Sequence, residues 1–400
     1  MDYDKDGLLD IILTNAIRPD KQAPTSLFHQ TNIGFEDVTV SSGLVFEKDV
    51  GSAQISNLAG DGDMELLFLV PSTQGIFQVS KFPFVNIQNS LNFPNMWSQD
   101  FVTDDFNGDL LQDIFFVTMK RETETYSDAL LADKFFLNTK NGFIDSTILS
   151  GFDVPTACSS VVSGDFDNDM DLDIYSLCSL NFSNLPNKLF ENNGDGTFNE
   201  ISNAGGAEGT NLGVGDSVIT ADFDNDGFLD IFLTNGYGPG PYSDNGISQL
   251  FRNLGNNNHW IEIDLIGTRS NHDGIGSRVL VKTGDVTQLR EQDAGMHHRS
   301  QNYMRMHFGL EQNSVIDSIV IFWPSGLVQE IKQESTNQIL KIVEPSTPLT
   351  PKHQTSLGLE PLKVICKDGM LLTLKKSDGS VACVKSSSLS ILIERGWALR

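Results

Sequence analysis

DFDNDGFLDIFLTNG, at residues 222–236, is the stretch of sequence that decides the fold. Its carboxylates follow the pattern D-x-D-x-D-G-x-x-D: Asp222, Asp224, Asp226 and Asp230. Oxygen ligands at alternate positions suit Ca²⁺, and Gly227 permits the sharp turn that such a loop needs. Apolar runs precede and follow the pattern, as expected for two β-strands. The stretch therefore predicts a calcium-binding turn that joins two strands.

Similar acidic windows of nine residues recur through the first part of the chain. They cover residues 2–10, 57–65, 105–113, 165–173 and 222–230. Their starts are 48 to 60 residues apart, and such a period marks a repeated supersecondary unit rather than one irregular fold. A turn between two further strands recurs after the windows, as in NNGDGTF at 192–198. Four strands per unit predict an all-β fold, a β-propeller with about five visible blades, of which the first is incomplete.

The predicted calcium ligands come from four of the five windows. They are Asp2, Asp4, Asp6 and Asp10; Asp105, Asn107, Asp109 and Asp113; Asp165, Asp167, Asp169 and Asp173; and Asp222, Asp224, Asp226 and Asp230. The second window offers Asn57, Ala59, Asp61 and Glu65, so we expect it to be weak or empty. An alternative is that all five are solvated acidic turns without an ion. Two carboxylates 4 Å apart repel by about 4 kcal/mol at an effective dielectric constant near 20, which favours a bound cation.

The overall charge limits the classes of partner. The chain has 27 Lys and Arg against 53 Asp and Glu, a formal net charge of -26, and most of the acidic excess lies before residue 257. This charge repels nucleic-acid phosphates and anionic lipid, and it favours a cationic partner. The longest apolar runs suit buried strands and are too short to span a bilayer.

Several stretches resemble known families. DFDNDGFLDIFLTNG at 222–236 and LFENNGDGTFNEISNAGG at 189–206 resemble the FG-GAP or VCBS repeats of calcium-binding propellers. Residues 258–281, 300–310 and 319–331 resemble the ASPIC/UnbV domain, a small β-rich domain. The combination is similar to the cartilage acidic protein family. The resemblance implies a secreted or surface protein with structural Ca²⁺ and a role in adhesion or in binding a protein or glycan. It establishes no enzymatic activity, and we expect none.

The resemblance and the composition together divide the chain into four parts. We expect a propeller over residues 1–256, an ASPIC/UnbV domain over 257–344, a Pro-rich linker over 345–361 and a small module over 362–400. The first unit lacks the strand that precedes the acidic window in the others, so we also expect further blades and a signal peptide upstream of Met1. The small module should form a hairpin followed by a short helix.

The cysteines form two local pairs, Cys158 with Cys178 and Cys366 with Cys383. Paired cysteines favour disulfides and an oxidising compartment, although buried free thiols remain an alternative.

Two further alternatives remain open. Five histidines between 259 and 307, including His297, His298 and His307, could form a metal or catalytic cluster, but their spacing matches no zinc pattern. Trp323 is expected to cover the core rather than to grip a sugar ring. The competing class of function is an extracellular polysaccharide lyase or hydrolase that uses the propeller as its scaffold.

Overall fold

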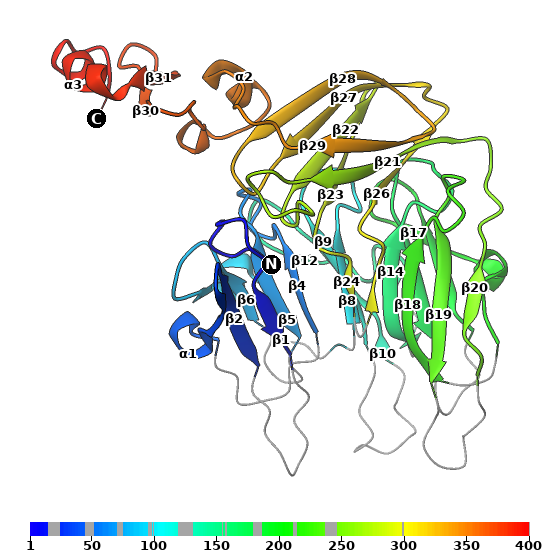
Figure 1. Ribbon diagram of the computed structural model, residues 1–400. Coiled ribbons are helices and arrows are strands. Elements are labelled where there is room, and N and C mark those ends of the chain that lie inside the picture. The colour runs from blue at the N-terminus through cyan, green and yellow to red at the C-terminus, as the bar shows by residue number, and fades with distance from the viewer. Residues whose placement is uncertain are drawn as a thin grey trace.

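The protein, seen in a computed structural model, consists almost entirely of β-strands (Figure 1). The structure describes residues 1–14, 25–44, 52–69, 75–94, 98, 100–118, 131–153, 155–156, 158–178, 186–210, 214–236, 246–297 and 300–399. Within these residues the first part of the chain forms five antiparallel sheets, one for each acidic window. The all-β fold class predicted from the sequence is confirmed, with sheets arranged as in a propeller.

The strands of the five sheets follow one another in chain order. Sheet one contains β1 (Ile11–Leu13), β2 (Ser26–Thr31) and β3 (Gly34–Asp37), and sheet two contains β4 (Ser52–Ser56), β5 (Glu65–Leu69), β6 (Gly75–Gln78) and β7 (Val85–Asn86). Sheet three contains β8 (Asp100–Asp104), β9 (Asp113–Val117), β11 (Lys134–Leu137) and β12 (Ile144–Asp145), and sheet four contains β14 (Cys158–Gly164), β15 (Asp173–Cys178), β16 (Lys188–Asn192) and β17 (Phe198–Ile201). Sheet five contains β18 (Val214–Ala221), β19 (Asp230–Gly236) and β20 (Gln249–Phe251).

Short elements connect these sheets. They are α1 (Thr39–Ser42), the 3-10 helices η1 (Gln88–Leu91) and η3 (Ser202–Gly206), and a small ladder of β10 (Leu131–Ala132) with β13 (Pro155–Thr156). Among the described residues, sheet one contains three strands, all of them after its acidic window.

An asparagine side chain ties each of sheets three, four and five to the sheet before it. Nδ2 of this residue donates to a backbone carbonyl in the acidic window of the preceding sheet: Asn138 to Leu58 (2.8 Å), Asn192 to Phe106 (2.8 Å) and Asn253 to Phe166 (2.7 Å). Apolar clusters lie between neighbouring sheets. The largest of them packs Phe115 and Phe135 of sheet three, and Phe152 of the segment that follows this sheet, against Phe190 and Phe198 of sheet four. The blades are therefore held together by both apolar packing and a repeated polar contact.

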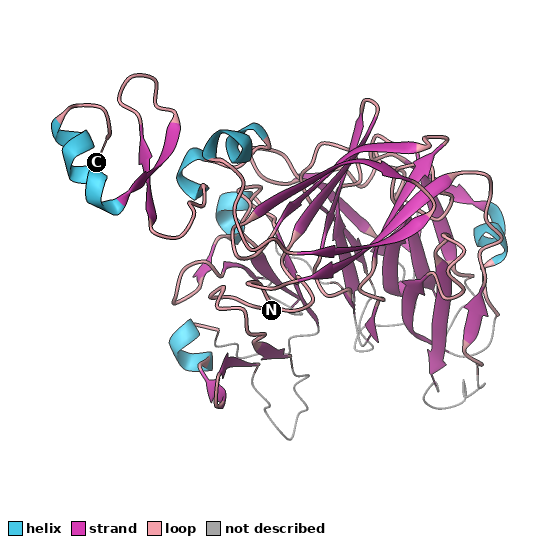
Figure 2. Ribbon diagram, turned by 45° about the horizontal axis from the view of Figure 1, so that its top comes forward, coloured by secondary structure: helices cyan, strands magenta, loops and turns pink. Residues whose placement is uncertain are grey.

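The segment after residue 257 folds as a two-layer β-sandwich (Figure 2). One sheet contains β26 (Met306–Glu311), β21 (His259–Ile266) and β29 (Gln338–Val343), with β21 and β29 parallel. The other contains β23 (Val286–Glu291), β22 (Arg278–Thr283), β27 (Val315–Phe322) and β28 (Val328–Ser335). Alternate residues of both sheets fill one core, and Trp323 lies in it with only 3% of its surface exposed. The sequence interpretation of Trp323 as a core residue is therefore the correct one.

A hairpin from this sandwich reaches between the blades. Its strands, β24 (Met296–His297) and β25 (Ser300–Gln301), contact the first strands of sheets two to five: β24 lies against β4, β8 and β14, and β25 against β18 (Figure 1). The hairpin thus occupies the place where the inner strands of the propeller converge. Nothing in the sequence analysis predicted this insertion.

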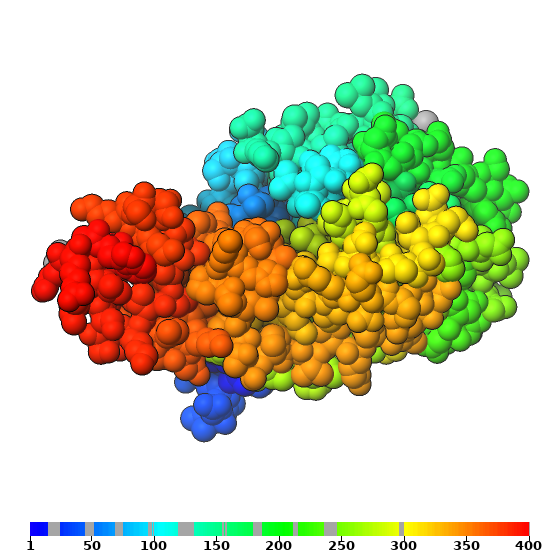
Figure 3. Space-filling model, turned by 90° about the horizontal axis from the view of Figure 1, so that it is seen from above, coloured from blue at the N-terminus to red at the C-terminus, as the bar shows by residue number. Residues whose placement is uncertain are grey.

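The C-terminal residues extend from one end of the sandwich (Figure 3). The segment expected to be a linker contains α2 (Pro351–Ser356), so that expectation was only partly right; Pro351 begins this helix, a position where the missing N–H of proline costs nothing. It is followed by η5 (Pro361–Lys363), the hairpin of β30 (Met370–Leu374) and β31 (Val381–Lys385), and α3 (Ser386–Glu394). Within the described residues, no helix has the length and apolar character needed to cross a membrane.

Both expected disulfides are present. Cys158 and Cys178 face each other across β14 and β15, and Cys366 and Cys383 link the start of the C-terminal module to β31.

Candidate metal-binding loops

All five acidic windows form the same loop, although their sequences differ. The fourth and sixth residues have left-handed backbone conformations in every window: Lys5 and Gly7, Gly60 and Gly62, Gly108 and Leu110, Asn168 and Met170, Asn225 and Gly227. Leu110 (φ 66°) and Met170 (φ 85°) adopt at the sixth position the conformation that glycine has in the other loops. A left-handed conformation costs a residue with a Cβ about 1–2 kcal/mol. The loop shape is therefore held by more than the local preference of its residues.

One hydrogen bond fixes the first side chain of each loop. The backbone N–H of the sixth residue donates to an oxygen of the first residue, at 2.7–3.1 Å: Gly7 to Asp2, Gly62 to Asn57, Leu110 to Asp105, Met170 to Asp165 and Gly227 to Asp222. This bond turns the first side chain back over the loop, where the side chains of the third and fifth residues also lie. The left-handed sixth residue is what points its N–H in this direction.

The ninth residue of the loop makes backbone contacts that the sequence did not suggest. We predicted Asp10, Asp113, Asp173 and Asp230 as ion ligands. In the structure each accepts backbone N–H groups on both oxygens: one from the second residue of its own loop, and one from a residue at the end of the strand that pairs with the strand following the loop. In sheets three to five this second donor is the same asparagine that ties the sheet to the preceding one. The ninth carboxylate therefore links the loop, its own sheet and the blade contact.

Carboxylate oxygens converge in three of the loops. Within 4.8 Å of one another lie oxygens of Asp2, Asp4 and Asp6; of Asp165, Asp167 and Asp169; and of Asp222, Asp224 and Asp230. Loop three presents Asp105 and Asp109 with the amide of Asn107 between them. The donor set consists of oxygens alone, which fits Ca²⁺. In addition, Oδ1 of Asp2 is buried without a hydrogen-bond partner among the described residues, as expected of an oxygen that awaits a cation.

Burial makes these loops costly without a compensating charge. Desolvation, with repulsion from neighbouring carboxylates, raises the pKa of Asp105 to about 6 and that of Asp165 to about 8. Burial, with repulsion from Asp4 and Asp6, also raises the pKa of Asp2 to about 6. A cation in each loop would offset this cost, because an opposite charge favours the ionised carboxylate.

In two loops, basic side chains partly supply the positive charge that offsets the carboxylates. In loop five, Arg252 bonds Asp224 through Nε (2.6 Å) and Asp226 through Nη2 (2.9 Å), with its side chain 54% exposed. In loop two, the ammonium groups of Lys5 and Lys363 both approach Asp63, at 2.9 and 3.3 Å. Loop two has lost two of the expected ligands and has gained two lysines. Weak or absent ion binding by loop two stays a prediction.

The sandwich covers loops four and five directly. The indole of Trp260 lies so close to Gly227 that a Cβ there would be 1.9 Å from Nε1 of Trp260. The carbonyl of Gly227 faces Nε2 of His307 (3.1 Å) and accepts from Nδ2 of Asn168 (3.0 Å). The carbonyl of Asn168 in turn accepts from the N–H of Glu311 (2.8 Å). Strand β26 and Trp260 thus join two ion loops of different blades to the sandwich.

These contacts also explain part of the histidine cluster. Burial lowers the pKa of His307 to about 4, so its ring is neutral and serves as a packing and hydrogen-bonding group against loop five. The side chain of His297 and both residues His298 and Arg299 lie outside the part of the chain that the structure describes.

Sequence comparisons agree with this architecture. The FG-GAP-like repeat family matches residues 105–176 and 177–233, and the ASPIC and UnbV family matches residues 267–349. The chain therefore combines FG-GAP-like repeats with an ASPIC/UnbV domain.

Among characterised proteins, the chain is homologous to cartilage acidic protein 1. It is 30% identical over 203 residues to the proteins of Mus musculus and Homo sapiens, which covers 48% of this chain and 30% and 29% of theirs. It is 24% identical over 231 residues to the Xenopus tropicalis protein, covering 54% of this chain and 32% of that one. The match thus spans about a third of the length of these relatives.

A solved structure, the V. cholerae biofilm matrix protein Bap1, aligns with 82% of this chain and 56% of its own, at 11% identity and a TM-score of 0.36. That similarity is too low to support a conclusion.

The sequence did not lead us to predict the asparagines that connect each blade to the preceding one. A signal was available, because an asparagine follows a short apolar pair in FFLN (135–138), LFEN (189–192) and LFRN (250–253). The recurrence of the asparagine was visible, but the backbone carbonyl that it bonds in the preceding blade was not.

Proposed function

We propose that the protein is an extracellular scaffold for adhesion or ligand binding, with structural Ca²⁺ ions in loops one, three, four and five. The observation that carries this proposal is the convergence of three carboxylates in each of loops one, four and five, two of which are also packed against the sandwich. A bound Ca²⁺ would supply positive charge and oxygen coordination inside each loop. The surrounding residues position the carboxylates and hold the loop in the conformation described above.

The ions would stabilise the fold rather than take part in a reaction. At a hundredfold excess of free ion over the dissociation constant, one site adds about 2.7 kcal/mol to the free energy of unfolding. Four such sites would rival the 5 to 15 kcal/mol that holds a typical domain together. The two disulfides and the homology to cartilage acidic protein 1 support an extracellular location.

The partner would be a protein or glycan recognised at the exposed surface. The net charge of -26 favours a basic protein partner over an acidic one, and it disfavours nucleic acid and anionic membranes.

Calorimetric titration of the full chain with Ca²⁺ tests the metal part of the proposal. We expect several binding events at up to millimolar concentration, a rise in the thermal unfolding temperature and reversal of that rise by a chelator. Titration with Mg²⁺ is the matched control, because its smaller octahedral shell is less suited to flexible carboxylate loops. No heat of binding and no shift of the unfolding temperature with Ca²⁺ would refute it.

The binding role needs a separate experiment. Immobilised basic proteins, acidic proteins and a panel of glycans would be compared for retention of the chain with and without Ca²⁺. We expect retention that depends on Ca²⁺ and falls as salt rises. Release of shortened or unsaturated sugars from any glycan would instead support the polysaccharide-active enzyme considered as the alternative.

A further inference from the structure

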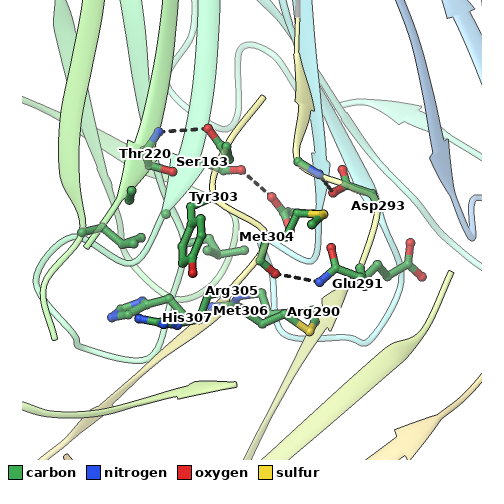
Figure 4. Close-up of a pocket in the computed structure, with 18 of the residues that line it drawn as sticks. Ser163, Thr220, Arg290, Glu291, Asp293, Tyr303, Met304, Arg305, Met306 and His307 are labelled. Atoms are coloured by element: carbon green, nitrogen blue, oxygen red, sulfur yellow. Dashed lines mark hydrogen bonds between the residues drawn. The ribbon is translucent and has the colours of Figure 1, made fainter. Parts of the chain in front are cut away.

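A partly open cavity of about 130 Å³ lies where the hairpin of the sandwich meets the inner strands of the blades (Figure 4). It is lined by the ends of β8, β14 and β18 on the blade side and by residues that flank the hairpin on the sandwich side. The close-up shows Ser163 and Thr220 on one side of this space and Asp293 on the other, with Tyr303 beside Ser163. The cavity borders loops four and five, because Asp165 and Asp222 are among the residues that line it, but loops one, two and three contribute none of its lining.

Two carboxylates face the cavity from opposite sides. Asp104 ends β8 and accepts a short hydrogen bond on Oδ2 from the hydroxyl of Ser163. Asp293 precedes the hairpin and accepts from the N–H of Gly295 on Oδ1 (2.7 Å) and from Nε2 of Gln54 on Oδ2. Both carboxylates line the same cavity.

Gln54 supplies an independent observation. Its side chain lines the cavity and the residue is 4% exposed, yet Oε1 has no hydrogen-bond partner among the described residues. An unpaired buried amide oxygen costs about 1–3 kcal/mol. Because Oε1 only accepts, the missing partner must be a donor or a cation. An anion is excluded by the same reasoning.

The nearby arginine does not fill this role. Arg290 lines the cavity, but its guanidinium donates to the carbonyl of Leu289 (2.9 Å) and to Oε1 of Gln288 (3.2 Å) on its own strand and lies over the ring of Phe308. Its hydrogen bonds are thus directed along β23 rather than to Asp104 or Gln54.

We propose that this cavity is a binding site for one hard metal cation, coordinated by oxygens of Asp104, Asp293 and Gln54 and by water. Carboxylate and amide oxygens are ligands for such cations, and the volume leaves room for water in the coordination shell. Since Gln54 and Asp104 come from two blades and Asp293 from the sandwich, the ion joins three separate parts of the chain. Its role is to hold the hairpin between the blades.

The test counts bound ions by native mass spectrometry of the full chain in Ca²⁺. The variants are Gln54→Met, which keeps the volume and removes the acceptor, and Asp293→Asn, which removes the charge and keeps the shape. Gln333→Met, at an exposed position of β28, is the matched control. We expect the first two variants to carry one ion fewer than the wild type, with at least tenfold weaker affinity for that ion, and the control to carry the full number.

A loop variant separates this site from the loops. Asp2→Asn, in loop one and outside the cavity lining, should lose a different ion, and the double variant Asp2→Asn with Asp293→Asn should lose two. Loss of an ion in Gln54→Met but not in Asp2→Asn would refute the loop proposal and leave this one standing. Equal ion numbers in the wild type, Gln54→Met and Asp293→Asn would overturn the cavity site.

Crystals of the wild type provide a measurement that does not depend on the folding of a variant. Anomalous scattering would be recorded from crystals grown in Ca²⁺ and in K⁺. A peak between Asp104 and Asp293 in either salt supports the site and distinguishes a divalent from a monovalent occupant. Density for water alone in both salts would overturn it.

Discussion

Replacement of Gly227 by alanine should break the contact between loop five and the sandwich. Gly227 has φ of 88°, where a Cβ costs about 1–2 kcal/mol. The added Cβ would also lie 1.9 Å from Nε1 of Trp260, so the indole or the loop must move, and overpacking of this kind costs about 1–3 kcal/mol. Together the free energy of unfolding should fall by about 2–5 kcal/mol. Gly108→Ala is the matched control, because Gly108 has φ of 72° with nothing within 4 Å of its Cβ position.

The free energy of unfolding would be measured by urea denaturation in saturating Ca²⁺, with circular dichroism as the probe. Gly108→Ala should lose about 1–2 kcal/mol through backbone strain alone. In a Trp260→Ala background the Gly227→Ala change should cost no more than the control does, since the overlapping ring is gone. Equal losses for Gly227→Ala and Gly108→Ala in the wild-type background would refute the reasoning that Trp260 presses on the loop.

Three further predictions follow from buried contacts. Burial raises the pKa of Asp133 to about 7, and its Oδ2 has no hydrogen-bond partner within the described structure. The free-energy cost of keeping this carboxylate ionised in the folded protein should therefore be nil below pH 4, grow as the pH rises and reach a few kcal/mol above pH 7. Asp133→Asn should therefore stabilise the chain at pH 8 but not at pH 4 in thermal unfolding, and equal effects at both would contradict this. Asn192→Ala should lower the free energy of unfolding, measured by urea denaturation, by about 1–3 kcal/mol, because it leaves the carbonyls of Phe106 and Leu172 unpaired. The same change at the exposed Asn199 should lower it by less than about 0.5 kcal/mol. Alkylation of the unreduced, denatured protein should label no cysteine; uptake of label before reduction would count against the two disulfides.

Much of the fold could be predicted because its signals are local. The five windows, their spacing and the flanking apolar runs place the loops between strands, and each loop is complete within nine residues. The hydrogen bond from Gly227 to Asp222 spans only five residues, so a single stretch of sequence determines it. The cysteine pairs were similarly accessible, since each joins neighbouring strands of one hairpin or segment.

The roles of individual loop residues were less accessible. Asp230 was predicted as an ion ligand, and the sequence did not show that both of its oxygens also accept backbone N–H groups, one of them from Asn253, which is 23 residues away. The positive φ of Met170 was also hidden, because the sequence shows no glycine at that position. Which side chain meets a backbone group depends on strand register, and the pattern of the loop alone does not set it.

The sequence by itself determined a repeated all-β chain with acidic loops, because periodicity and ligand spacing are properties of short segments. Only the tertiary structure decided that the sandwich closes over those loops and inserts a hairpin between the blades. His307 and Gly227 are 80 residues apart, and Gln54 and Asp293 are 239 apart. Contacts over such separations arise when whole blades and sheets pack, and no local pattern records which faces will meet.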